Sequence, residues 1–121
     1  MQSLTGTDVR EGTVRRPLQI NFEPYAHFKR DLIELMIENL QELQQAYALS
    51  TVQRDKTFFQ TAYHKSKTTV RILEDHEFLV VVEELTKPKP CAEHVLLFHR
   101  LTGEIITSLW IENEAGDKQA M

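Results

Sequence analysis

A run of apolar residues at helical intervals constrains the fold of this chain more than any other feature of its sequence. The run begins at Phe28, and the charged residues between its members fall largely on the other side of the helical wheel. Its members are Phe28, Leu32, Leu35, Met36, Leu43 and Tyr47. The spacing predicts a long amphipathic helix that buries one side. Asn21 and Pro24 are typical of its start, because a helix accepts proline only in its first turn.

A second helix is predicted over residues 51 to 73. Ser50-Thr51-Val52-Gln53 matches the capping box, in which the serine side chain accepts from a free backbone N–H and the glutamine reaches back. The apolar stripe of this helix consists of Phe59, Ala62, Tyr63, Val70 and Leu73.

The C-terminal half of the chain admits two interpretations. Glu74-Asp75-His76 offers a cap for a short third helix that ends before Pro88, and a fourth helix would follow. Val80-Val81-Val82 also fits a buried strand, and Leu101-Thr102-Gly103-Glu104 also fits a hairpin turn. Four helices give an all-α, antiparallel up-and-down four-helix bundle, whereas two helices and three strands give a small α+β domain. The bundle is favoured, because the last apolar stripe runs past Gly103, which lies off it.

The length and composition fit one globular domain. The chain has 121 residues, of which 41% are hydrophobic and 26% charged. Residues 1 to 19 contain two glycines and three threonines without apolar periodicity, so a flexible N-terminal arm is expected there. We expect residues 20 to 113 to form the helical domain and residues 114 to 121 to be a disordered tail.

Several classes of protein are disfavoured by the sequence. A net charge of −4 argues against a nucleic-acid binder, which needs a concentrated basic surface. No apolar run approaches the roughly 20 residues of a membrane span, and the N-terminus lacks the hydrophobic core of a signal peptide. The single cysteine, Cys91, cannot form an intramolecular disulfide. We therefore expect a cytoplasmic protein that binds neither nucleic acid nor membrane.

One face of the second helix carries a histidine. At about 100° per residue, His64 points about 150° away from the centre of the apolar stripe, toward water. Its neighbours on that face are Thr57, Gln60, Thr61, Lys67, Thr68 and Arg71. The simplest account is a solvated helix face. The chemical account is a nucleophilic imidazole with cations within a turn to hold an anion, and the anion that fits best is a phosphoryl group.

The residues around His64 also follow a known pattern. His64-Lys65-Ser66-Lys67-Thr68 is preceded by Phe59 and Ala62 and followed by Leu73. This segment resembles the central motif of histidine-containing phosphotransfer (HPt) domains, which runs Ala-His-x-x-Lys-Gly-Ser and then Leu-Gly. Residues 31 to 43 resemble that family's helix before the histidine, and residues 79 to 85 resemble the helix after it.

The resemblance implies a phosphorelay intermediate of two-component signal transduction. His64 would accept a phosphoryl group from the aspartyl phosphate of a receiver domain and pass it to another receiver. Lys67 corresponds to the family lysine that stabilises the phosphoryl group. Gln60, Thr68 and Arg71 are candidate flanking contacts, of which Gln60 and Arg71 come from the helical wheel alone. Thr68 replaces the usual glycine, which narrows the approach but supplies a hydroxyl donor.

The resemblance also implies which partners the chain meets. The sequence shows no Walker motif, no phosphate-binding Gly-rich loop and no paired metal-binding carboxylates, so we expect a phosphocarrier and not a kinase or other enzyme. The expected partners are response-regulator receiver domains and a hybrid histidine kinase, with the chain itself a monomer. No cofactor or metal is expected on the chain, and Mg²⁺ would belong to the receiver only.

Two alternative functions stay open at the level of sequence. One is a docking module for receiver or kinase domains that accepts no phosphate. The other is a small α+β ligand-binding domain. An apolar docking surface beside His64 is expected from Phe58 and from exposed edges of Leu40 and Ile37.

Overall fold

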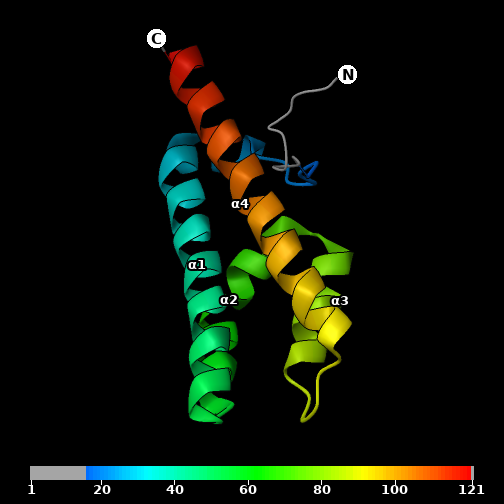
Figure 1. Cartoon of the computed structure of the whole chain (residues 1–121). Coiled ribbons are helices and arrows are strands. Elements are labelled where there is room, and N and C mark those ends of the chain that lie inside the picture. The colour runs from blue at the N-terminus through cyan, green and yellow to red at the C-terminus, as the bar shows by residue number, and fades with distance from the viewer. Residues whose placement is uncertain (1–15, 121) are drawn as a thin grey trace, which may run out of the picture.

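The computed structural model of the chain describes residues 16–120, with side chains as far as Ala115, and the regular secondary structure of these residues is helical with no β-strand (Figure 1). A 3₁₀ helix, η2, precedes four α-helices. The elements are η2 (Glu23–Phe28), α1 (Lys29–Gln53), α2 (Thr57–Leu73), α3 (His76–Leu85) and α4 (Ala92–Ala120). The prediction of an all-α fold is confirmed. The α+β interpretation is wrong for residues 16–120, because the Val80 to Val82 run follows a helical pattern in which Val81 and Val82 are buried and Val80 is exposed.

The four α-helices pack around one hydrophobic core. α1 contacts both α2 and α4, α3 packs on α4, and a lighter contact joins α2 to α3. Figure 1 shows α4 crossing the molecule obliquely, close to α1 in its upper part and over α3 in its lower part. All four helices contribute fully buried side chains, among them Ile33, Met36, Leu40, Leu43, Leu73, Phe78, Val82, Phe98, Leu101, Ile105 and Leu109. The arrangement is that of a helical bundle.

Helical structure begins close to the predicted Asn21 and Pro24, but as a 3₁₀ helix with Phe22 at its N-cap, and the α-helix starts only at Lys29. The Asn21 side chain accepts a hydrogen bond from the Glu23 N–H at 3.1 Å, and Pro24 lies in the first turn of η2. This 3₁₀ helix continues directly into α1, which runs to Gln53. Arg54 then adopts a left-handed conformation with φ of 54° and ends the helix.

The capping box predicted at Ser50 is wrong, because residues 51 to 53 belong to α1 and α2 begins only at Thr57. Ser50 nevertheless caps α2 from a distance in sequence. Its side-chain oxygen accepts the backbone N–H of Phe59 at 2.9 Å, in the first turn of α2. Asp55 accepts the N–H of Thr57 at 2.9 Å. The two side chains satisfy N–H groups that a helix start leaves without partners.

The predicted cap of α3 is confirmed, since Asp75 accepts the N–H of Phe78 at 3.1 Å.

The exposed Cys91 precedes α4. Gly103 lies within α4, and no atom stands within 4 Å of the place a Cβ would occupy. Residues 114–120, expected as part of a disordered tail, continue α4, and Met121 lies outside the described residues.

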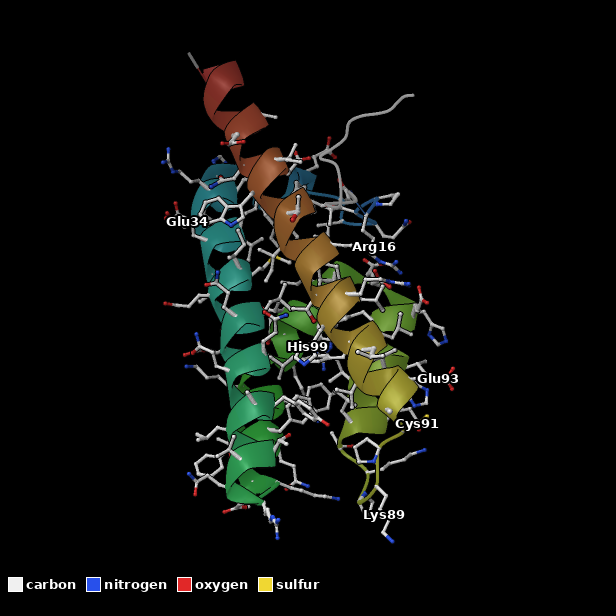
Figure 2. All side chains as sticks on the ribbon, in the orientation of Figure 1. Arg16, Glu34, Lys89, Cys91, Glu93 and His99 are labelled. Atoms are coloured by element: carbon white, nitrogen blue, oxygen red, sulfur yellow. The ribbon has the colours of Figure 1, made fainter. Side chains whose placement is uncertain are left out.

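Part of the expected N-terminal arm lies against the bundle. The Arg16 N–H donates to the Ser108 hydroxyl at 2.9 Å, and that hydroxyl donates to the Arg16 carbonyl at 2.6 Å. The Arg16 guanidinium also reaches Asp75 at 3.0 Å and Glu77 at 2.8 Å, in the region where Figure 2 labels Arg16. Leu18 packs on the core behind it. Residues 1–15 of the expected arm lie outside the described residues.

Burial of Asp75 raises its pKa, but hydrogen bonds from the Arg16 side chain and from the Phe78 N–H outweigh this effect. The net result is a pKa below the usual value of 3.8. The carboxylate that caps α3 is therefore ionised near neutral pH and is also the anchor for Arg16.

Candidate functional site

His64 lies on the exposed face of α2, as the helical wheel predicts. Gln60, Lys67, Thr68 and Arg71 are exposed with it. On a helix, residues three or four positions apart are neighbours, with roughly 5–6 Å between their Cβ atoms. Gln60, Lys67 and Thr68 therefore surround the imidazole within one turn, and Arg71 follows two turns on.

The imidazole of His64 is free to react. Within the part of the chain that the structure describes, its side chain takes part in no hydrogen bond, ion pair or ring contact. A neutral imidazole has one ring nitrogen that carries a lone pair, and here no protein donor blocks it. The side chain can therefore act as a nucleophile toward a group that approaches from solvent.

Two cations on the exposed face are available to an anion. The Lys67 ammonium lies 5.7 Å from the centre of the Tyr63 ring, a cation–π contact, and has no hydrogen-bond or ion-pair partner among residues 16–115. Burial, and to a smaller degree the charge of Glu83, raises the pKa of the Tyr63 hydroxyl, so this ring stays neutral. Arg71 has no side-chain partner among residues 16–115. Both cations therefore remain for a ligand.

Lys65, next to His64 in sequence, points elsewhere. Its ammonium forms an ion pair with Glu42 of α1 at 3.1 Å. The lysine thereby bridges α2 to α1 rather than facing the space above the imidazole. Two lysines follow His64 in the sequence, at positions 65 and 67, and their surroundings give them different roles.

The inward face of α2 holds a polar contact that the sequence analysis missed. The Asn39 amide of α1 donates to the Thr69 hydroxyl at 2.8 Å, and the Ser66 hydroxyl donates to the Asn39 carbonyl at 3.4 Å. All three residues are buried. On a helical wheel, Ser66 and Thr69 lie on the same side as the buried Leu73, and this position is the sequence signal that predicts their burial. These bonds fix α2 against α1 within two turns of His64.

An open groove lies between α1 and α2, and its lining includes Thr61 and Lys65 but not His64 itself. Its lining includes Phe58 and Leu49, which are 39% and 41% exposed. Phe58 therefore is the exposed apolar residue that was expected, and Leu49 is one that the sequence did not reveal. The expectation for Leu40 and Ile37 is wrong, because these side chains are 0% and 4% exposed and belong to the core.

The described residues hold no cluster of three or more His, Cys, Asp or Glu side chains suited to a metal ion. Across residues 16–120, no helix combines the length and hydropathy that crossing a bilayer requires. Comparisons with family models, with curated proteins and with solved structures found no match for this chain.

Proposed function

We propose that this chain is a phosphorelay intermediate of a two-component system, in which His64 carries the phosphoryl group. The proposal rests on one observation above all: an exposed, unengaged imidazole on a bundle helix with Lys67 one turn away. The resemblance to HPt domains agrees with this arrangement and includes the same lysine.

The chemistry follows from the surroundings of His64. The lone pair of an imidazole nitrogen attacks the phosphorus of a receiver aspartyl phosphate. An N–P bond forms while the P–O bond breaks, and the aspartate leaves as a carboxylate. A second receiver aspartate reverses the exchange. Lys67 and Arg71 balance the charge on the phosphoryl oxygens, and Thr68 and Gln60 supply donors within one turn.

The groove between α1 and α2 is the proposed docking place for the receiver. Phe58, nearly two turns before His64 along α2, and Leu49 of α1 are exposed in this groove, and an exposed apolar patch is a usual feature of an interaction site. In this proposal the bundle has the antiparallel up-and-down topology of HPt domains, and the protein acts as a cytoplasmic monomer. A hybrid histidine kinase and response regulators are its partners, and the receiver supplies Mg²⁺.

Phosphotransfer from a cognate receiver tests the proposal. The chain is mixed with a receiver labelled at its aspartate, and an acid-labile label is expected to move onto the chain. His64→Gln should abolish the transfer, and His76→Gln, which changes an exposed histidine of α3, should leave it intact. Label retained by His64→Gln would refute the assignment. A receiver that binds the wild-type chain without transfer would favour a docking module instead.

A further inference from the structure

A pocket of about 230 Å³ lies at the end of the molecule where α1 gives way to α2. It is formed by the last turns of α1, the first turn of α2 and the segment that follows α3. In Figure 1 this is the lower end, where α1 stops and the loop between α3 and α4 turns. The pocket is separate from the groove beside Phe58, with which it shares no lining residue.

The inner wall of the pocket is apolar and aromatic. Tyr47, Phe59 and Leu85 line it, and Pro90 closes it on the loop side. The rings of Tyr47 and Phe59 meet edge to face, with centroids 5.3 Å apart and planes at 84°. Aromatic rings prefer such offset or perpendicular neighbours, so a further ring can pack against the half-buried Tyr47, behind which Phe59 is buried.

The rim of the pocket carries positive charge. Arg54, Lys56 and Lys87 line it together with a single acid, Asp55. The lining therefore has three cations and one anion, a formal charge of +2, in a chain whose net charge is −4. A local excess of cations in an acidic chain marks the pocket as attractive to an anion.

Two of the rim cations are available to a ligand. Lys87 pairs with Glu84 at 2.6 Å. By contrast, the side chains of Arg54 and Lys56 have no hydrogen-bond or ion-pair partner among residues 16–115. The Asp55 carboxylate is bound to Thr57, whose side chain and N–H both donate to it and lower its pKa, so it keeps its charge. The nearby negative charge favours a singly charged anion over a doubly charged one.

We propose that this pocket binds a small aromatic carboxylate, with its ring against Tyr47 and its carboxylate at Arg54 and Lys56. The planar guanidinium of arginine pairs with both oxygens of a carboxylate. Pockets for drug-sized ligands measure about 300–1,000 Å³, so this smaller one fits a molecule with one ring. Gln60 lines the pocket and also lies one turn from His64, but the proposed contacts with the ligand involve neither Gln60 nor the imidazole.

Binding of 4-fluorobenzoate, followed by fluorine NMR, tests the proposal on the intact chain. 4-Fluorobenzamide, neutral and of nearly the same shape, and 4-fluorobenzylamine, a cation, serve as matched ligands. We expect the carboxylate to bind most tightly and the amine most weakly. In the amide NMR spectrum of the protein, the chemical-shift changes caused by the carboxylate should concentrate at the pocket, around residues 50 to 60 and 85 to 87.

Variants separate the contribution of charge from that of shape. The double change Arg54→Gln and Lys56→Gln should weaken 4-fluorobenzoate about tenfold or more and leave 4-fluorobenzamide unchanged, since one charge-assisted contact is worth roughly that factor. Lys89→Gln is the control, because Lys89 is on the same loop as Pro90 but points away from the bundle in Figure 2. It should not alter either affinity.

Several results would overturn the proposal. Equal affinity for the carboxylate and the amide would show that the rim cations do not select the ligand. Shifts centred on the groove at Phe58 and Thr61, or no shift at millimolar ligand, would remove the pocket as the site. If the double variant does not fold, the ranking of the three ligands on the wild-type chain still decides the question.

Discussion

The two faces of α2 both carry polar residues, but those near the middle of the helix differ in whether they are bonded to the rest of the protein. On the inward face, Ser66 and Thr69 are buried and bonded to Asn39. On the outward face, His64 and Arg71 have no partner among the described side chains. Bonded polar groups position the helix, and unbonded ones are available to a ligand. Inward substitutions should therefore cost stability, and outward ones should cost phosphotransfer.

The largest effect is expected from Phe59→Ala on the inward face. Phe59 is 2% exposed and contacts the rings of Tyr47 and Phe98. Its loss should lower the free energy of unfolding by about 3–5 kcal/mol, measured by urea denaturation. The adjacent Phe58→Ala, at a side chain that is 39% exposed, is the control and should cost far less. Similar losses for both would break the distinction between the faces.

Thr69→Val should have the next largest effect. Valine keeps the shape of threonine but leaves the buried Asn39 amide without its acceptor at 2.8 Å. The expected loss is about 1–3 kcal/mol of unfolding free energy. Thr68→Val makes the same change one residue earlier, on the exposed face, and should stay within about 0.5 kcal/mol. Equal stability of the two variants would mean that the hydrogen bond to Asn39 contributes nothing.

Lys67→Ala tests the outward face. We expect phosphotransfer to His64 to slow about tenfold, equivalent to about 1.4 kcal/mol of transition-state stabilisation, with no change in the urea midpoint. Lys65→Ala is the matched control, since that ammonium is paired with Glu42. A rate unchanged in Lys67→Ala, or slowed equally in both variants, would contradict the role given to Lys67.

The smallest effect is a loss of stability at acid pH. The carboxylate responsible is Asp75, before α3, since α2 itself contains no Asp or Glu. The folded-state pKa of Asp75 is below its usual 3.8. Its contribution to stability is therefore complete above about pH 4 and is lost as the pH falls through the folded-state pKa. The amount should be about 1 kcal/mol or less, as for a partly exposed ion pair.

Urea denaturation between pH 2 and pH 6 measures this loss. Asp75→Asn should flatten the acid part of the profile relative to the wild-type chain. Glu93→Gln, at an exposed acid near the start of α4, is the control and should leave the profile unchanged. An unchanged slope in Asp75→Asn would show that Asp75 is not the group responsible.

Apolar periodicity predicted most of the fold because each helix buries one continuous stripe. The stripes placed Phe59, Val70 and Leu73 in the core, and they placed His64 on the solvent side. The cap at Asp75 could also be predicted, since it depends on a bond to a residue three positions away. These features are local, and local sequence is sufficient to specify them.

What the sequence could not supply depends on contacts between distant segments. Ser50 fits a local capping box, but the helix continues past it and its hydroxyl caps α2 through Phe59. The bond between Asn39 and Thr69 joins residues 30 positions apart. The periodicity of apolar residues carries no information about a hydrogen bond between two polar side chains. The pocket at Arg54 and the anchoring of Arg16 likewise require the assembled bundle.

Gly103 is a position at which a substitution could raise the free energy of unfolding of this chain. The residue lies inside α4, is exposed, and has open space where a Cβ would stand. Glycine in a helix interior costs about 1 kcal/mol relative to alanine. Gly103→Ala would therefore provide a more stable parent chain, remote from α2, in which severely weakened variants such as Phe59→Ala can still be purified folded and compared.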